Sequence, residues 1–147
     1  MKELADKVAI VTGAGRMRGI GRAAAVRLAE LGAHVVVTGT GRDPKTFPDD
    51  EQKANWKDIE STAEQIRAHG VKALTLVVDV TDQIQVENMI RDTISKFGRV
   101  DILINNAGIA SMNHSLLTTI DTVHKVLNTN IVGTFLFCRE AAKLMQI

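Results

Sequence analysis

The chain has 147 residues, of which 45% are hydrophobic and 24% are charged, and its formal net charge is +1. This length allows one domain with a buried core, and the composition is that of an ordinary globular protein. The balance of 18 basic and 17 acidic residues argues against a nucleic-acid partner. No apolar run could span a membrane, no signal-peptide core is present, and the single cysteine excludes an internal disulfide. We therefore expect a cytoplasmic protein without a membrane partner.

The first expected element is an apolar strand that ends at a glycine-rich turn. Residues 8–11 read Val-Ala-Ile-Val, and Gly13, Gly15, Gly19 and Gly21 follow. Apolar residues then recur at helical spacing, which predicts the order strand, turn, helix. The buried face of this helix is expected to consist of Ile20, Ala24, Leu28 and Leu31.

Such a turn brings backbone N–H groups and the positive end of a helix dipole together, which suits the pyrophosphate of a dinucleotide. The strict Gly-x-Gly-x-x-Gly spacing is not met, because Arg18 stands where the third glycine is required. An ordinary strand-to-helix turn that needs small residues for packing is therefore the alternative interpretation.

The next stretch contains a second strand and an irregular segment. The strand covers 33–38, and 39–57 is expected to be a long polar loop, of the kind that is usually functional or mobile. Trp56, at the end of this loop, is interpreted as a hydrophobic anchor rather than a ligand-stacking residue. Asp58 is expected to open a helix that closes at Gly70.

The remaining chain continues the alternation of strands and helices. A strand over 73–78 precedes a helix that is capped by Thr81 or Asp82 and closed by Gly98. A fourth strand over 100–104 leads through a loop to a long helical region from about residue 122 onward.

This alternation predicts an α/β fold, a Rossmann-type doubly wound parallel sheet in three αβα layers. Right-handed crossovers give the strand order 3-2-1-4. The order reverses between strands 1 and 4, so residues 13–21 and 105–108 are expected to flank one ligand crevice.

Four motifs occur in register along the chain: Thr12-Gly13…Gly19-Ile20-Gly21, Asp79-Val80-Thr81-Asp82, Asn105-Asn106-Ala107-Gly108 and Asn130-Ile131-Val132-Gly133. Together they resemble the motifs of the short-chain dehydrogenase/reductase family over essentially the whole chain. The resemblance implies that residues 1–147 form an NAD(P)-binding Rossmann domain, the N-terminal part of a single family domain. It implies hydride transfer between nicotinamide and a small carbonyl or alcohol substrate, in a protein that is a homodimer or homotetramer when complete.

The resemblance also implies roles for individual residues. Asp79 accepts from the adenine amino group, Asn106 steadies the sheet, and Asn130 kinks its helix and holds a water in a proton relay, which makes Asn130 the one catalytic candidate. The cofactor-binding candidates are Gly13, Gly15, Arg18, Gly19, Ile20, Gly21, Arg42, Asp79, Val80, Asn105, Ala107 and Gly108.

The cofactor form is predicted from the end of the second strand. An NAD enzyme places an acidic residue there, but this position is Gly39, and the next carboxylate is Asp43. Arg42 follows the strand and Arg18 precedes Gly19, and an arginine fork suits a 2′-phosphate. We therefore expect NADP(H) rather than NAD(H); two solvated surface arginines are the alternative. Gly39 also argues against a nucleotide-fold methyltransferase.

Two features depart from the family pattern. Five residues separate Gly13 from Gly19 where the common form has three, which is similar to the branch that includes enoyl-acyl-carrier-protein reductases, although serine usually stands there in place of Gly19. The chain also has no tyrosine, and of the family's catalytic tetrad only Asn130 is present. We therefore expect the cofactor-binding half of a longer reductase, inactive alone; an inactive NADP(H)-binding module that acts through a partner is the alternative.

Two further residue types carry little functional signal. The four histidines share no metal-ligand spacing, so no metal site is expected. Cys138 is interpreted as a core helix position rather than a nucleophile.

Overall fold

The computed structural model describes residues 2–145, and its centre is a four-stranded parallel sheet. The strands are β1 (Val8–Val11), β2 (His34–Gly39), β3 (Ala73–Val77) and β4 (Ile102–Ile104). Their order is β3-β2-β1-β4, as predicted, and every pair is parallel. The third and fourth strands are shorter than expected from the apolar runs.

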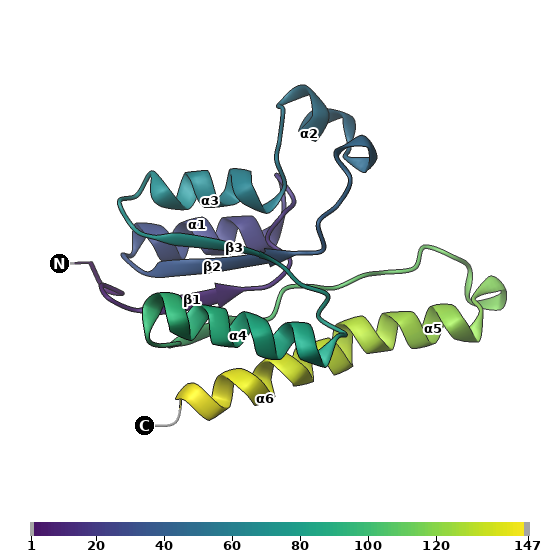
Figure 1. Cartoon of the computed structure of the whole chain (residues 1–147). Coiled ribbons are helices and arrows are strands. Elements are labelled where there is room, and N and C mark those ends of the chain that lie inside the picture. The colour runs from purple at the N-terminus through teal and green to yellow at the C-terminus, as the bar shows by residue number, and fades with distance from the viewer. Residues whose placement is uncertain (1, 146–147) are drawn as a thin grey trace.

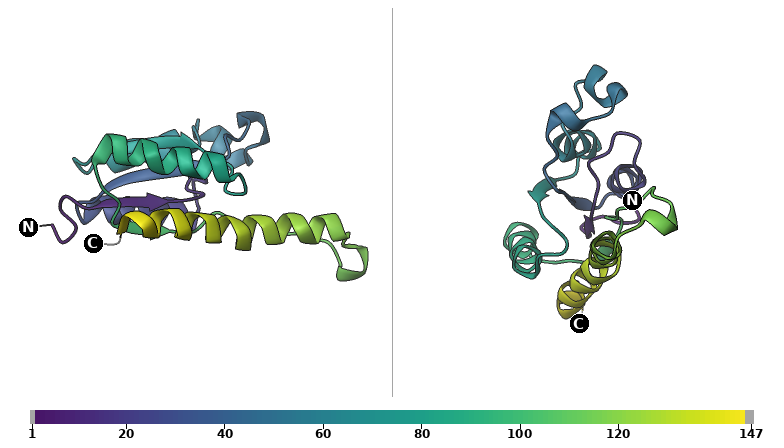
Figure 2. Two further views of the ribbon diagram at one scale, coloured as in Figure 1. Left: turned by 60° about the horizontal axis from the view of Figure 1, so that its bottom comes forward. Right: turned by 90° about the vertical axis from the view of Figure 1, so that its right-hand side faces the viewer.

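Helices cover both faces of the sheet and form two cores (Figures 1 and 2). On one face lie α1 (Ile20–Glu30) and α3 (Ile59–Arg67), and on the other lie α4 (Gln83–Phe97) and α6 (Gly133–Met145). In the core beneath α1 and α3, β-branched residues of the sheet pack against alanines and Ile66. In the core on the other face, other strand residues pack against Met89, Leu136 and Phe137. The alternation of side chains along each strand supplies both faces, which confirms the three-layer prediction.

The buried face of α1 differs from the predicted one by one position. Gly21, Ala25 and Ala29 are buried, whereas Ile20 is 81% exposed. Small residues bring α1 close to the sheet, and this close approach determines its rotation more strongly than the larger apolar side chains do. Ile20 instead lies at the exposed N-terminus of the helix.

The segment after β2 is more ordered than the predicted loop. It contains the 3₁₀ turn η1 (Pro44–Thr46) and the short helix α2 (Asp49–Lys53), which projects beyond the sheet in Figure 1. Asp58 precedes α3 but does not cap it: its φ is +51° and its side chain makes no capping hydrogen bond. The carboxylate is used in a contact with Arg42 described below.

The last helical region contains an interruption at the predicted asparagine. After the 3₁₀ turn η2 (Ser115–Leu117), α5 (Ile120–Leu127) begins two residues earlier than expected. A π-helical turn, Asn128–Val132, then joins α5 to α6. Of the two predicted caps of helix α4, Thr81 and Asp82, the carboxylate of Asp82 is the one observed. The helix is closed at its other end by Gly98, with φ +77°.

One carboxylate joins the beginnings of two strands. Asp101, before β4, accepts the N–H of Val8 at 2.9 Å and the Nε–H of Arg99 at 2.8 Å. The hydrogen bond from the Arg99 guanidinium, with further help from Val8 and the Lys7 ammonium, holds the pKa of Asp101 below its ordinary value.

We predict that Asp101→Asn destabilises the protein at pH 7 by about 1 kcal/mol. A depressed folded-state pKa gives stability that is present above the unfolded pKa and is lost as pH falls below about 4. Urea unfolding at several pH values measures the loss in free energy of unfolding, and a substitution at an exposed residue, Asp92→Asn, is the control. An equal loss at pH 7 and pH 3 would contradict the assignment.

Candidate functional site

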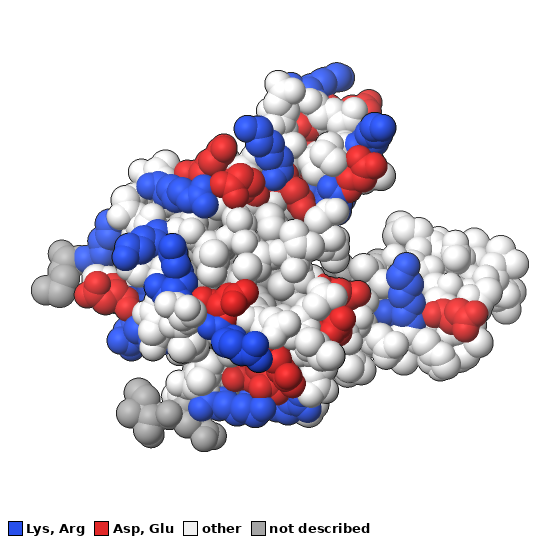
Figure 3. Space-filling view, in the orientation of Figure 1, with Lys and Arg blue, Asp and Glu red and all other residues white. Residues whose placement is uncertain are grey.

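A cavity of about 570 Å³ lies where the carboxyl ends of all four strands meet. Its walls come from the turn after β1, the ends of β2 and β3, the segment after β4, and α5 with the π turn. Figure 3 shows the surrounding surface, on which positive and negative side chains are interspersed, whereas the part formed by α5 is mostly uncharged. This is the edge at which parallel α/β sheets bind their ligands.

The glycine turn after β1 packs directly against the segment after β4. Gly13 has φ +65°, and a Cβ there would lie 2.7 Å from the Cα of Ala107. The Asn106 amide donates to the carbonyl oxygens of Thr12 and Gly13, both at 2.9 Å. A Cβ on Gly21 would lie 2.4 Å from this amide nitrogen, so glycine is required for the contact.

The N-terminus of α1 opens onto the cavity without a neutralising group. Its N-cap is Gly19, no side chain caps it, and its first turn holds no acidic residue. Gly19 and Ile20 both line the cavity. The first N–H groups and the positive helix end are therefore available to an anion at the cavity wall.

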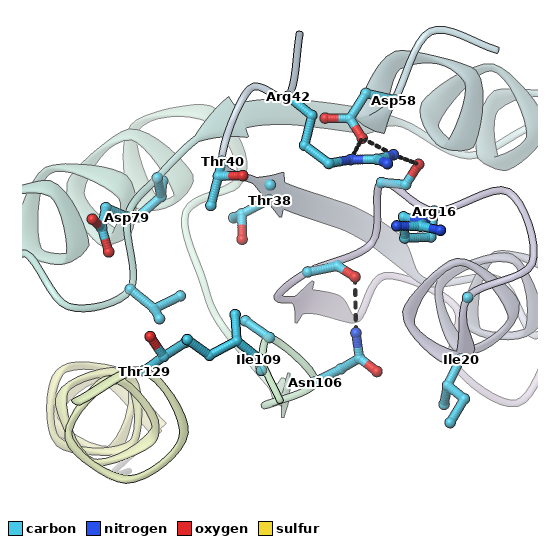
Figure 4. A pocket seen from close by; sticks show the side chains of 18 of the residues that line it. Arg16, Ile20, Thr38, Thr40, Arg42, Asp58, Asp79, Asn106, Ile109 and Thr129 are labelled. Carbon is cyan, nitrogen blue, oxygen red and sulfur yellow. Dashed lines mark hydrogen bonds and ion pairs between the residues drawn. The ribbon is translucent and has the colours of Figure 1, made fainter. Parts of the chain in front are cut away.

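Two arginines and one aspartate form the corner beside β2 (Figure 4). Arg42 donates from Nε and Nη2 to Asp58 Oδ1, at 3.1 and 2.7 Å, and from Nη2 to the carbonyl oxygen of Gly15 at 3.2 Å. Its guanidinium also lies 4.4 Å from the ring centre of Phe47. Arg16, 57% exposed at its side chain, lies beside it in the wall. Both guanidinium groups therefore belong to the cavity wall, and each is paired with a buried carboxylate, Arg42 with Asp58 and Glu51 and Arg16 with Glu51.

The opposite side carries Asp79 and Thr129, as Figure 4 shows. Asp79 Oδ1 accepts from the backbone N–H and the hydroxyl of Thr81, at 2.9 and 2.7 Å. This turn fixes the carboxylate where β3 ends, and Val80 and Lys125 lie nearby in the wall. The carboxylate keeps a second oxygen that can accept from a ligand.

The structure brings most of the predicted cofactor residues together at the cavity. Those that line it are Gly13, Gly15, Gly19, Ile20, Arg42, Asp79, Val80, Ala107 and Gly108.

Four predicted residues lie outside the cavity wall. The Arg18 side chain is exposed and pairs with Asp50 at 3.0 Å, away from the β2 corner. Gly21 lies under Asn106, and the amide of Asn105 contacts Cys138 Sγ at 3.2 Å. The side-chain amide of Asn130 accepts a hydrogen bond from the Ile109 N–H and donates one to the Ile109 carbonyl oxygen, each at 2.9 Å.

Several lining residues were not among the individual cofactor-binding candidates, although Arg16 and Asn106 lie in the stretches expected to flank the crevice and Gly39 was expected at the end of β2. They are Arg16, Thr38, Gly39, Thr40, Asp58, Val78, Asn106, Ile109, Lys125 and Thr129. The strand-end rule could have found Thr38 to Thr40, since they follow directly from the predicted end of β2. Nothing local predicts Asp58, which enters the site only because the intervening segment folds back.

Cys138 and Trp56 both lie outside the cavity wall. Cys138 is exposed and is not a core residue, because Leu136 and Phe137 form the buried face of α6 instead. Trp56 is half-buried and belongs to neither hydrophobic core; it is attached to the glycine turn by a hydrogen bond, in which its Nε1 donates to the Gly15 carbonyl oxygen at 2.6 Å. Within residues 2–145, no three metal-ligating side chains gather, and no helix has the length and apolarity needed to cross a membrane.

Comparison with known proteins gives consistent matches. A family model described as short chain dehydrogenase matches residues 7–146. The chain is 37% identical over 146 residues to hydroxysteroid dehydrogenase-like protein 2 of Rattus norvegicus, covering 98% of this chain and 26% of that protein. It is 38% identical over 143 residues to versicolorin reductase 1 of Aspergillus parasiticus, covering 97% of this chain and 49% of that protein.

Solved structures give the same result. A short chain dehydrogenase of Mycobacterium paratuberculosis bound to NAD has a TM-score of 0.84 at 28% identity, covering 97% of this chain and 52% of that chain. A mutant short-chain dehydrogenase/reductase of Serratia marcescens has a TM-score of 0.80 at 31% identity, with coverage of 97% and 52%. The chain therefore belongs to the short-chain dehydrogenase/reductase family of oxidoreductases, which bind nicotinamide dinucleotides, and it spans about a quarter to a half of the length of these relatives.

We predict that Gly13→Ala destabilises the protein by at least about 2 kcal/mol more than Gly70→Ala. Both glycines have positive φ, so both variants carry the backbone cost of about 1–2 kcal/mol. Only at Gly13 does the new Cβ meet another backbone segment, since nothing lies within 4 Å at Gly70. Thermal and urea unfolding measure the stability lost by each variant. Equal losses of stability would show that the contact with Ala107 is unimportant.

Proposed function

We propose that residues 1–147 supply the dinucleotide-binding half of a short-chain dehydrogenase/reductase that acts on a small carbonyl or alcohol substrate. The observation that carries the proposal is the uncapped N-terminus of α1, which opens with the glycine turn onto a cavity at the strand ends. A pyrophosphate group there would accept hydrogen bonds from backbone N–H groups, and the Asp79 carboxylate would accept one from the adenine amino group. The bound cofactor would supply the hydride chemistry.

Asn130 is proposed as the catalytic residue of this half. Its side chain is fixed by two hydrogen bonds to Ile109, and it lies in a π turn, a helix irregularity that is frequent at functional sites. An inactive binding module that acts through a partner is the second candidate.

NADP(H) is the proposed cofactor. The support is the pair of arginines, Arg16 and Arg42, in the wall beside β2. Arg18, which the sequence suggested for this role, lies away from the wall, and Arg16, which lies in it, is proposed instead. A guanidinium binds phosphate oxygens by charge-assisted hydrogen bonds, which a ribose hydroxyl alone does not offer.

NAD(H) is the alternative, and Asp58 is the observation that favours it. Its Oδ2 is buried and has no hydrogen-bond partner among the described residues, and a Cβ on Gly39 would lie 3.4 Å from it. A carboxylate at the end of β2 is what a ribose 2′-hydroxyl requires. The Mycobacterium paratuberculosis structure is that of an NAD-bound protein.

We predict that the purified chain binds NADPH at least about tenfold more tightly than NADH. Arg42→Ala should weaken NADPH binding about ten- to hundredfold, and NADH binding far less, because it removes a charged phosphate donor. Isothermal titration calorimetry measures the dissociation constants, with circular dichroism as a check of folding.

Arg27→Ala is the matched control, since Arg27 lies at the far end of α1 and pairs with Glu30. Tighter binding of NADH, weakened by Asp58→Asn, would contradict the NADP(H) proposal and support NAD(H). Failure to bind either cofactor in a folded chain would contradict the proposed function itself.

A homo-oligomer, either a dimer or a tetramer, is proposed for the complete protein, in the cytoplasm. The support is an apolar strip along α5, the π turn and α6, where Ile120, Leu127, Ile131 and Phe135 are 48–64% exposed. Contiguous apolar surface of this kind is typical of protein interfaces.

A further inference from the structure

The long turn between Gly13 and Gly19 and the segment after β2 meet at one buried carboxylate. It belongs to Glu51 of α2 and is 3% exposed at its side chain. Glu51 is not a residue of the cavity wall; the arginines that contact it are. A buried charge of this kind must be compensated by hydrogen bonds and ion pairs.

Three groups compensate it. The backbone N–H of Met17 donates to Oε1 at 2.8 Å, Arg16 Nε lies 3.2 Å from the same oxygen, and Arg42 Nη1 lies 3.1 Å from Oε2. The first contact holds the middle of the glycine turn, and the other two hold the arginines of the wall. One side chain therefore fixes both parts of the site that the proposed cofactor would contact.

The orientation of Arg42 is almost completely determined before any ligand arrives. Glu51, Asp58 and the Gly15 carbonyl oxygen take hydrogen bonds from its guanidinium, whose face lies over Phe47. Trp56 donates to the same carbonyl oxygen, so the segment after β2 and the glycine turn hold each other in place. A preorganised group loses little conformational entropy when it binds.

We infer that Glu51 is a positioning residue for cofactor binding, which sets the shape of the glycine turn and holds Arg16 and Arg42 in the cavity wall beside the expected place of a 2′-phosphate. Arg42 already makes four hydrogen bonds, so it would offer that phosphate its charge and its remaining Nη1–H group. This inference rests on the proposed function. The carboxylate touches neither the cavity nor the expected ligand, and acts through the three groups that it holds.

The charge of Glu51 and its positioning role have opposite effects on phosphate binding. As a nearby negative charge, the carboxylate repels a phosphate, so its neutralisation should strengthen NADPH binding. As a positioning group, it orders the turn and the arginines, so its removal should weaken NADPH binding. The sign of the change in affinity therefore distinguishes the two roles.

The test compares wild type, Glu51→Gln, Glu51→Asp and the control Asp50→Asn by calorimetric titration of the chain with NADPH and NADH. Asp50 is adjacent in α2 but pairs only with the outward-facing Arg18 among the described residues. Positioning predicts that Glu51→Gln weakens NADPH binding about tenfold or more and lowers the preference over NADH. Glu51→Asp keeps the charge but shortens the reach, so it should weaken NADPH binding as well, while Asp50→Asn should stay within about twofold.

Unchanged or tighter NADPH binding by a folded Glu51→Gln chain would overturn the inference. Both Glu51 variants failing to fold would also overturn it, because Glu51 would then serve stability alone. The wild-type titration tests the proposed function separately. If the wild-type chain prefers NADPH and the Glu51 variants bind NADPH equally tightly, only the role of Glu51 is contradicted. A folded wild-type chain that binds neither cofactor contradicts both.

Discussion

The contact between the glycine turn and the segment after β4 is the constraint on which the site depends. Gly13 approaches the backbone of Ala107 so closely that no Cβ fits, and Asn106 donates two hydrogen bonds back across the gap. Because β1 and β4 are the strands between which the sheet order reverses, this contact fixes the floor of the crevice. The N-terminus of α1 is then aimed into the cavity by the rotation that Gly21 allows.

The fold could be predicted because hydrophobic periodicity and turn residues determine the elements, and chirality then restricts their order. The strand order follows from the handedness of the crossovers, and capping chemistry restricts the cap of α4 to Thr81 or Asp82, of which Asp82 is the one observed. The irregularity around Asn130 was expected from the family resemblance. The buried face of α1 was assigned wrongly because large apolar side chains were given more weight than the small residues that permit close packing. Local patterns contain no information about which of two adjacent faces must approach a backbone.

The β2 corner could not be predicted, because its residues are brought together by tertiary folding alone. Asp58 lies 16 residues from Arg42 along the chain and yet accepts two of its hydrogen bonds. In the glycine turn, Arg16 pairs with the buried Glu51 and Arg18 pairs with the more exposed Asp50, a difference that no spacing rule describes. The turn and the segment after β2 are therefore best understood as one unit, with Glu51 as their common partner.

The central claim is that a dinucleotide binds in the cavity through the glycine turn and the strand ends. Titration of the ¹⁵N-labelled chain with NADPH, followed residue by residue by NMR, tests it most directly. The account predicts that the largest amide shift changes fall on residues 13–21, with further changes at Asp79, Val80 and residues 107–108. Changes confined to α5 and α6, or no changes in a folded chain, would contradict it.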